Sequence, residues 1–361
     1  MSNGYDRNLL TKRFYDYEDD IETNPTTRKL DDHVLVIDGF NTFIRAFSVN
    51  PSLNEDGSHV GGLVGFLKSI RYTINKFKPT RCVIVFDGKN SSKPRQKVFP
   101  EYKAGRKPKS RLVRAYDFAS EEDERKNMLK QLQSVIGYLQ MLPVTIVAMD
   151  NIEADDVIAH LSKQIFDESE VVISSTDKDF LQLINHRIKV YSPTKKKTYD
   201  RDAIYDEYGI PSKNFLTYRI LEGDKSDNIP GVRGAGLKTI IKRFPKITDR
   251  DEPYYTLEEC IKISDEKKDE LKLYESVDIC KEQLFLNRKL MQLFNVDITP
   301  SSKMKIMDLV ESPITELIKF KFETKFVQDK LFTALPNLQG WLNQNFTQLN
   351  RYARMSHGKK A

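Results

Sequence analysis

Short runs of mainly apolar residues alternate with helical patterns through the first half of the chain. The runs cover residues 34–37, 82–86, 144–149 and 171–175. Between them, apolar residues recur at the spacing of amphipathic helices, as they do up to residue 77. Runs of this kind are typical of strands buried on both faces of a parallel sheet. The pattern therefore predicts an α/β fold with a mostly parallel central sheet flanked by helices.

Acidic residues follow three of these predicted strands. Asp38 and Asp87 each precede a glycine, and Asp177 comes just past the fourth run. In an open α/β sheet the ligand crevice lies outside the carboxyl ends of the strands, so these distant acids should meet at one edge. Because Asp-Gly is also a common turn signal, each instance alone is weak evidence.

The third strand leads into a denser acidic group at the start of a predicted helix. Glu153, Asp155 and Asp156 crowd its first turn, and Asp179 joins Asp177 beyond the next strand. Acids also favour the positive end of a helix dipole, which is the plain alternative. So many carboxylates within one region favour a divalent-metal cluster, because hard cations such as Mg²⁺ take oxygen ligands.

A basic segment falls between the second and third strands, where it would hang over this edge. Its cations far outnumber its single acid, Glu101; they are Lys93, Arg95, Lys97, Lys103, Arg106, Lys107, Lys109, Arg111 and Arg114. Such a block is often a solvated tail. Beside an acidic cluster it indicates a binding surface for a polyanion, and its prolines predict an arch over about residues 88–125 in place of one continuous helix.

The second half changes character. Residues 188–191 and 197–199 predict a hairpin or edge strands, and helices with glycine-rich turns follow from residue 201. Residues 255–361 are expected to be helical and to buttress the helical half, with Trp341 as a packing anchor. The expected organisation is a mobile tail at 1–32, an α/β core at 33–200, a helical DNA-binding subdomain at 201–300 and a C-terminal helical segment at 301–361.

A glycine-rich turn precedes a predicted helix from residue 237 to about 244. Backbone N–H groups can approach an anion there, helped by the helix dipole and by Lys238 and Thr239. No strand leads in, and the Gly-Lys-Ser/Thr order is absent, which argues against both common nucleotide-binding loops. A helix–hairpin–helix grip on a nucleic-acid backbone fits better than a plain turn between helices. Its contacts would come from Gly231, Val232, Gly234, Gly236, Lys238 and Thr239, with Lys93 and Arg95 contributing from the arch.

Composition narrows the class of protein. The 361 residues carry a net charge of +6 and a mean hydropathy of −0.53, without a transmembrane-length apolar run or a signal-peptide pattern. The three cysteines are far apart, which argues for a reducing compartment and against a disulfide framework or a zinc site. We expect a monomer without a membrane partner.

These motifs resemble those of the structure-specific 5′-nucleases, or flap endonucleases, over roughly residues 34–244. The similarity is strongest around Asp38-Gly39, Asp87-Gly88, residues 100–106, 153–156, 175–179 and 223–236. The compact size is similar to that of phage replication enzymes, including the phage ribonuclease H type that removes lagging-strand RNA primers. The resemblance implies a PIN-like 5′-nuclease fold with a helical arch.

The resemblance also implies roles for individual residues. Asp87, Glu153, Asp155 and Asp177 would hold a first Mg²⁺, with Asp38 and Asp156 acting through water bound to it. Asp179, Asp224 and Asp227 would hold a second, with Mn²⁺ as a substitute. Lys103 and Arg106 would engage the scissile phosphate, Tyr102 would stack nearby, and the glycine hairpin would bind K⁺. The family's stacking aromatic past the first Asp is not clearly matched, since Ile44 falls near that point.

The function expected is a Mg²⁺-dependent 5′-to-3′ exonuclease and flap endonuclease acting on duplex DNA or RNA–DNA hybrid in the cytoplasm of a phage-infected bacterial cell. Its partners would be branched or 5′-ended duplexes and replication proteins such as a single-strand-binding protein or a sliding clamp. Two alternatives stay open: a PIN-type ribonuclease or phosphatase, and a non-catalytic factor that binds structured DNA.

Overall fold

The computed structural model describes residues 28–104, 112–114, 116–251 and 253–358. In this part of the chain a six-stranded sheet has the order β3-β2-β1-β4-β5-β6. Strands β1 to β5 pair in parallel and β6 pairs with β5 in the antiparallel sense, which confirms the mostly parallel sheet. The strands are β1 (His33–Asp38), β2 (Arg81–Asp87), β3 (Thr145–Met149), β4 (Glu170–Ser174), β5 (Ile188–Ser192) and β6 (Lys197–Tyr199).

The continuous apolar runs arise because both faces of the sheet are covered. Alternate residues of a strand point to opposite faces. On β1, Val34 and Val36 enter one buried apolar core, while Leu35 and Ile37 enter the other. A strand that supplies two cores has no solvent-facing positions, so polar alternation is absent from its sequence.

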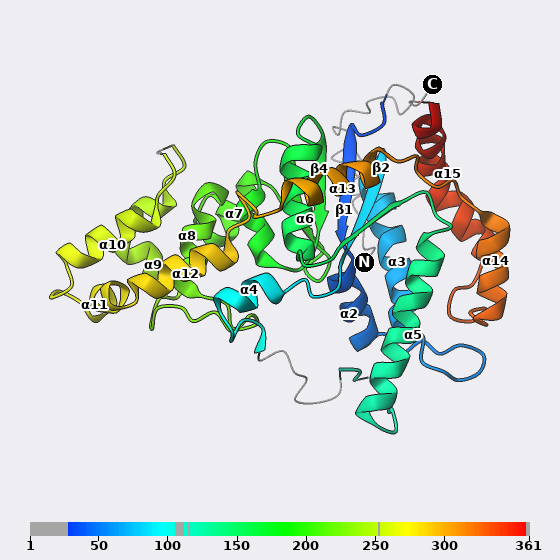
Figure 1. Ribbon diagram of the computed structural model, residues 1–361, viewed down its shortest axis with the longest axis horizontal. Coiled ribbons are helices and arrows are strands. Elements are labelled where there is room, and N and C mark those ends of the chain that lie inside the picture. Colours follow the sequence, from blue (N-terminus) through cyan, green and yellow to red (C-terminus); the bar gives the residue numbers. More distant parts are fainter. Residues whose placement is uncertain (1–27, 105–111, 115, 252, 359–361) are drawn as a thin grey trace, which may run out of the picture.

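Helices cover the two faces unequally (Figure 1). Helices α2 (Gly39–Val49), α3 (Gly61–Phe77) and α5 (Glu121–Leu139) line one face. The other face carries α6 (Ala154–His160), which continues as the π-helix η2 (Leu161–Ile165), together with the 3-10 helix η3 (Lys178–Leu183). Beyond them, the apolar core runs without a break into the helical half of the molecule.

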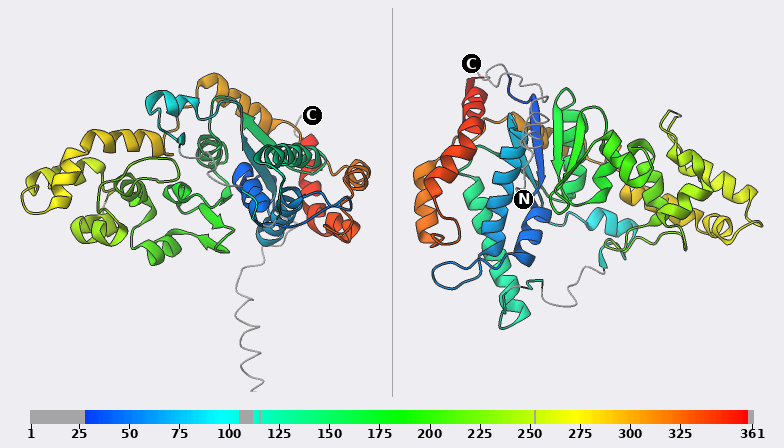
Figure 2. Two further views of the ribbon diagram at one scale, coloured as in Figure 1. Left: turned by 90° about the horizontal axis from the view of Figure 1, so that it is seen from below. Right: turned by 180° about the vertical axis from the view of Figure 1, so that it is seen from behind.

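The helical half follows β6 and extends to one end of the elongated molecule (Figures 1 and 2). Asn287 is fully buried and donates from Nδ2 to the carbonyl oxygens of Ile220 at 3.1 Å and Pro230 at 2.8 Å, so the later helices support the glycine-rich turn. The elements are α7 (Arg201–Tyr208), α8 (Ser212–Glu222), α9 (Leu237–Arg243), η4 (Pro245–Thr248), α10 (Leu257–Glu266), α11 (Lys272–Ile279) and α12 (Lys281–Met291).

The last helices do not buttress the helical half, contrary to the expectation from sequence. Helix α13 (Pro300–Glu311) lies against β3, while α14 (Lys319–Gln328) and α15 (Leu338–His357) pack on the α3 and α5 side of the sheet (Figure 1). The ring of Phe322 packs between those of Tyr138 and Trp341 in tilted arrangements, with ring centroids at 4.7 and 5.6 Å. Trp341 is a packing anchor, as predicted, but it serves the sheet and not the helical half.

The predicted N-terminal tail covers residues 1–32, of which residues 1–27 lie outside the described part of the chain. The described end of that segment is anchored. Leu30 is buried against Ile314 and Tyr352, and Asp31 pairs with the Nε atom of buried Arg81 at 2.5 Å. The tail prediction is therefore wrong for these residues, because their apolar partner comes from the far end of the sequence.

The strand order reverses at β1. The chain moves outward through β2 and β3, then returns to place β4 on the opposite side of β1. A reversal of this kind leaves a crevice at the carboxyl ends of the strands. Asp38 ends β1 and Asp87 ends β2, so both border that crevice.

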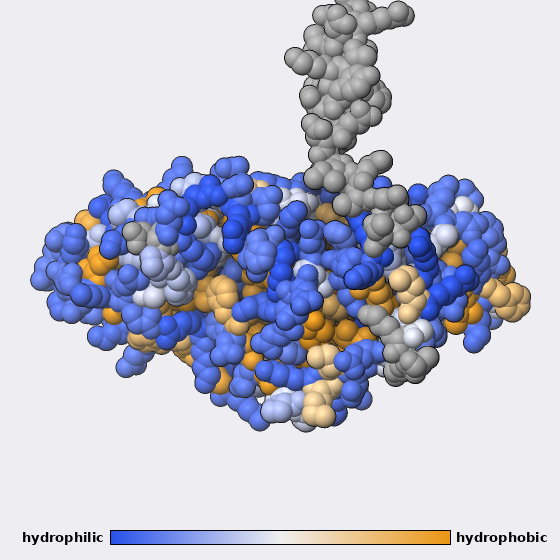
Figure 3. Space-filling view, turned by 90° about the horizontal axis from the view of Figure 1, so that it is seen from above, coloured by the Kyte–Doolittle hydropathy of each residue, from blue (hydrophilic) through white to orange (hydrophobic). Residues whose placement is uncertain are grey.

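The surface in Figure 3 is mostly hydrophilic, with apolar residues in scattered patches. Within the described residues, no helix has the length and apolar character needed to cross a membrane.

Replacing Phe322 by alanine should lower the free energy of unfolding by about 3–5 kcal/mol, because a fully buried ring leaves a cavity between α14, α15 and α5. Chemical denaturation measures the change. Phe320→Ala on the same helix is the control, since that ring is 79% exposed and its loss should cost about 0.5 kcal/mol or less. Equal effects of the two changes would show that the C-terminal helices are not packed as part of the α/β core.

Candidate active site

The first group of acids is joined by short contacts across neighbouring strands. Asp38 caps α2 by accepting from the Asn41 N–H at 3.1 Å, and its other oxygen accepts from the Ser175 hydroxyl at 2.9 Å. The same hydroxyl accepts the Asp177 N–H at 3.1 Å. Asp87 accepts from the Ala154 N–H at 3.1 Å, which ties the end of β2 to the start of α6. The predicted meeting of distant acids at one edge of the sheet is therefore present.

Glu153 is the most heavily engaged of these acids. It precedes α6 and is 1% exposed, and its carboxylate accepts from Ser92 at 2.7 Å, Arg95 at 2.7 Å and Lys103 at 2.6 Å. Burial alone would raise the pKa of Glu153, but the charges of Arg95 and Lys103 lower it to about 2. This side chain is therefore ionised and held by cations from the basic segment.

The side chain of Arg95 is only 14% exposed and is committed to carboxylates, which corrects its predicted role as a contact for nucleic acid. It belongs to α4 (Lys93–Val98), and its guanidinium bonds to both Asp156 oxygens at 2.7 and 2.8 Å and to Glu153 at 2.7 Å. Its Nε also donates to the Leu290 carbonyl at 3.0 Å. An arginine committed to two carboxylates has its planar fork of donors occupied. Lys93, the other predicted contact on α4, is exposed.

Tyr102 is similarly corrected. Its ring is 3% exposed, and its hydroxyl donates to Glu153 at 2.9 Å and lies 3.2 Å from Asp227. Burial and the nearby Glu153 raise the pKa of this phenol, so it stays protonated and acts as a donor. A buried ring cannot stack on a nucleic-acid base. Tyr102 instead links the acids of the sheet edge to the loop that carries Asp227.

Lys103 sits at the base of the arch in a left-handed backbone conformation, with φ of 57°. Its N–H donates to the Asp227 carbonyl at 2.9 Å, and its side chain reaches Glu153. The Asn228 amide also donates to the Glu101 carbonyl at 3.0 Å. Arg106, the other predicted phosphate contact, lies outside the described residues, as do residues 107–111 of the arch.

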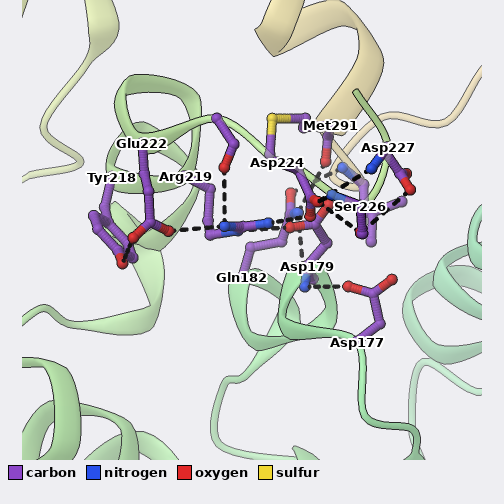
Figure 4. Close-up of polar contacts among 12 residues, drawn as sticks. Asp177, Asp179, Gln182, Tyr218, Arg219, Glu222, Asp224, Ser226, Asp227 and Met291 are labelled. Atoms are coloured by element: carbon purple, nitrogen blue, oxygen red, sulfur yellow. Dashed lines mark hydrogen bonds and ion pairs between the residues drawn. The ribbon is translucent and has the colours of Figure 1, made fainter. Parts of the chain in front are cut away.

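The second group of acids is organised by an arginine that the sequence did not single out (Figure 4). Arg219 on α8 is 5% exposed and donates to Asp179 at 2.9 Å, Glu222 at 2.8 Å and Asp224 at 2.5 Å. Burial opposes its charge, but the Asp179 and Asp224 carboxylates raise the pKa of Arg219 above its usual value. Its sequence signal is a charged residue among positions of α8 that are otherwise apolar or uncharged and buried.

Three central acids have pKa values above the usual range of an aspartate. Burial raises the pKa of Asp38 to about 7, and Asp177 and Asp87 add to the effect. Burial and then Asp179 raise the pKa of Asp177 to about 7. The pKa of Asp155 is also raised well above its usual value by burial and by Asp177. Burial is the main cause of all three shifts, so these carboxyl groups lie in a poorly solvated part of the edge.

The donor set suits a divalent cation. All the donors are carboxylate oxygens, the kind that Mg²⁺ and Mn²⁺ prefer. Burial raises the pKa values of Asp38 and Asp177, and a bound cation would favour the ionised form of both. In the described residues, however, no three acidic, histidine or cysteine side chains are gathered as a finished coordination shell. Arg95, Lys103 and Arg219 orient several of these carboxylates instead. The predicted ligand assignments therefore stay predictions.

The glycine-rich turn divides into a structural part and an open part. A Cβ on Gly231 would meet the Glu222 carbonyl oxygen at 1.9 Å, so this glycine permits close packing of two backbone segments. Gly234, with φ of +82°, and Gly236 have nothing within 4 Å of such an atom. Lys238 is exposed and Val232 is buried, so Val232 can contribute only its backbone.

A groove of about 810 Å³ joins this turn to the acids. Its lining includes Asp177, Arg219 and Asp224 together with Gly234, Gly236 and Thr239 of the turn and α9. A ligand held by the glycine turn would therefore extend towards the acidic edge.

Two residues near the groove, Asn41 and Phe40, were not singled out from the sequence. Asn41 lines the groove and donates to the Thr176 hydroxyl at 2.8 Å. Phe43 and Phe47 are fully buried, so neither can stack on a base, whereas Phe40 in the first turn of α2 is 38% exposed. Burial decides between these aromatic residues, and local sequence does not specify it.

Comparison with known proteins points to one family. Residues 33–209 match the family described as 5′-3′ exonuclease, N-terminal resolvase-like domain. A 5′-3′ exonuclease of Buchnera aphidicola (strain APS) is 30% identical over 227 residues, which cover 62% of this chain and 74% of that protein. One from Aquifex aeolicus is 30% identical over 58% of this chain and 68% of its own. DNA polymerase I of Bacillus caldotenax is 31% identical over 71% of this chain and 27% of the polymerase.

Solved structures share the fold. A bacteriophage T5 flap endonuclease in a pseudo-enzyme-product complex with DNA and metal ions has a TM-score of 0.57 at 19% identity, covering 82% of this chain and 99% of that one. A T5 5′-exonuclease with bound zinc has a TM-score of 0.57 at 21% identity, covering 84% and 100%. At these identities the similarity bears on the fold alone, and it confirms the predicted 5′-nuclease fold.

Replacing Arg219 by glutamine should lower the free energy of unfolding by about 3–5 kcal/mol, because removing one member of a buried ion cluster leaves its partners uncompensated. Thermal or chemical denaturation measures the loss. Arg354→Gln is the matched control, since its pair with Glu316 is exposed and should contribute little. An unchanged stability in the Arg219 variant would mean that this arginine does not hold the second acidic group together.

Proposed function

This chain belongs to the 5′-3′ exonuclease family, and we propose that it hydrolyses phosphodiester bonds near the 5′ ends of duplex nucleic acid, flaps included, with divalent metal ions. The observation that carries the proposal is the convergence of acids from β1, β2, α6 and the turn after β4 with those of the 224–227 loop. The groove from these acids to the glycine turn supports a polymeric substrate.

The assignment of ligands follows the resemblance and the donor set. Asp87, Glu153, Asp155 and Asp177 would hold one Mg²⁺ and Asp179, Asp224 and Asp227 a second, with Asp38 and Asp156 nearby. Such ions activate the attacking water and stabilise the leaving oxygen when they are bound. Mn²⁺ has the same preference for oxygen ligands and would substitute.

The protein's own side chains would prepare the site for a phosphate. Lys103 brings a positive charge to the acidic edge, where it can offset charge that develops on the phosphate during the reaction. Because its backbone is bonded to the Asp227 carbonyl, the ammonium is attached to a fixed base at the foot of the arch. Arg106 would act beside it.

The glycine turn would grip the duplex away from the cut. Gly234 and Gly236 face open space at the start of α9, so backbone N–H groups there could approach a phosphate. Thr239 lines the same groove and exposed Lys238 follows Gly236 directly, which would add a hydroxyl and a charge. K⁺ bound at the carbonyl oxygens of this turn is part of the same proposal.

The natural substrate we propose is an RNA–DNA hybrid or a 5′ flap formed during DNA replication, with removal of lagging-strand RNA primers as the biological role. Similarity to DNA polymerase I supports a link to replication. Placement in a phage rests on the sequence resemblance to phage 5′-nucleases.

With a 5′-labelled flap and Mg²⁺, the protein should release short 5′ products, and chelation of the metal should abolish them. Asp177→Asn should slow cleavage by about 100-fold or more, because a metal ligand contributes several kcal/mol to the transition state. Manganese binding, followed by electron paramagnetic resonance, should weaken in the same variant.

Asp297→Asn is the control, because Asp297 is an exposed acid outside the site. An RNA–DNA hybrid and a nicked duplex in parallel reactions test substrate choice. Full cleavage by Asp177→Asn would overturn the metal assignment, and binding without cleavage by the unaltered protein would favour a non-catalytic DNA-binding factor.

Gly236→Ala should weaken duplex binding severalfold without loss of stability. The added methyl group meets nothing within 4 Å, but it would occupy the space through which a phosphate approaches the turn. Fluorescence anisotropy with a labelled duplex in chelator measures the affinity. Gly358→Ala, which also meets nothing within 4 Å, is the matched control. Equal affinities of the two variants would argue against a backbone grip at this turn.

A further inference from the structure

A second cavity lies at the carboxyl edge of the sheet, on the side covered by α2 and α3. Its volume is about 290 Å³, and it is bordered by the ends of β1, β4 and β5. The glycine groove reaches α2 at Asn41, whereas this cavity reaches the same helix at Thr42 and Arg45. Asn41 and Arg45 lie one helical turn apart on α2, so the two depressions are neighbours along this helix.

The charged side chains that line this cavity are all positive. Arg45, Lys68 and Lys196 line it, and no carboxylate of the described residues does. The Nε and Nη2 atoms of Arg45 are shielded from solvent, and neither has a hydrogen-bond partner among the described residues. Burial lowers the pKa of the Arg45 guanidinium, so the surroundings disfavour its charge. A shielded arginine whose N–H groups lack acceptors is suited to bind an anion, because the anion would supply the hydrogen-bond acceptors.

The mouth of the cavity suits a planar ring beside that anion. Tyr72 is 50% exposed and stacks on Tyr191, with ring centroids 6.3 Å apart and planes at 26°. Lys68 and Lys196 are both exposed around the same opening. The volume is at the lower limit of ligand pockets, about 300 Å³, so it admits one small group and not a helical segment.

We propose that this cavity binds the phosphate of a single nucleotide, with the shielded Nε and Nη2 atoms of Arg45 as donors and Lys68 and Lys196 at its mouth. The nucleoside would lie beside Tyr72. The choice of a nucleotide over another phosphate compound rests on the proposed function. Two sources share this chemistry: a phosphate within a strand near the cut, and a nucleoside monophosphate released by cleavage.

Binding of a labelled 5′-flap duplex to the full-length protein tests the first source. Fluorescence anisotropy in chelator, over a series of KCl concentrations, separates binding from cleavage. Lys68→Ala and Lys196→Ala should each reduce the slope of log affinity against log salt by about 0.9, the value for one phosphate contact. Arg45→Gln should weaken binding about tenfold, as the loss of a charge-assisted hydrogen bond does, and Arg45→Lys should restore part of it.

Arg71→Ala is the matched control, because Arg71 is an exposed cation on α3 that does not line the cavity. Isothermal titration with deoxyadenosine monophosphate and with inorganic phosphate tests the second source. If the nucleotide binds and Arg45→Gln removes that binding, the site takes released product. If the cavity variants change duplex binding and the free nucleotide does not bind, the site takes a phosphate within a strand.

Cavity variants that match Arg71→Ala in slope and affinity, together with no binding of the free nucleotide, would overturn the proposal. Cleavage of the flap by the unaltered protein with Mg²⁺ is measured in parallel. If the unaltered protein cleaves the flap but the cavity variants change neither duplex nor nucleotide binding, the proposed phosphate site is wrong and the proposed function stands. Nucleotide binding in a protein that does not cleave removes the proposed function and leaves the site in place.

Discussion

Keeping several carboxylates together where water is partly excluded is the constraint on which this molecule depends. Like charges repel strongly in such surroundings, so each acid needs a cation or hydrogen-bond donors. Arg95 and Lys103 serve the acids around α6, and Arg219 serves those near the 224–227 loop. Between these two sets, Asp38 and Asp177 are held by Ser175 and by backbone N–H groups, and their pKa values stay raised. Bound divalent cations would supply the missing positive charge.

The fold could be predicted because its strands are buried on both faces. Continuous apolar runs at β1, β2, β3 and β4 follow directly from two cores that share one sheet. The acids could be located for the same reason, since strand ends in a parallel sheet define one edge. The local sequence pattern was sufficient to predict a residue's position wherever that position depends on a strand and the turn that follows it.

Other assignments failed where the controlling contact comes from a distant part of the chain. From sequence, Tyr102 and Arg95 are expected to be surface residues of a basic segment. In the structure both bond to Glu153, far along the sequence, which leaves Tyr102 buried and Arg95 only partly exposed. Phe322 and Trp341 pack on the sheet, although a local helical pattern cannot say which partner a helix covers. Arg219 had no recognisable spacing, because its role depends on acids from η3 and from the loop after α8. Tertiary contacts of this kind have no signature in local sequence.

The pairing of β1 with β4 has a consequence for synthesis of the protein. The central strand, which carries Asp38, can acquire its second neighbour only after residue 174 has been made, and Asp224 and Asp227 come later still. At ordinary translation rates the interval from Asp38 to Asp227 is roughly ten seconds or more. A growing chain on the ribosome therefore lacks part of this acidic edge until most of its length has emerged.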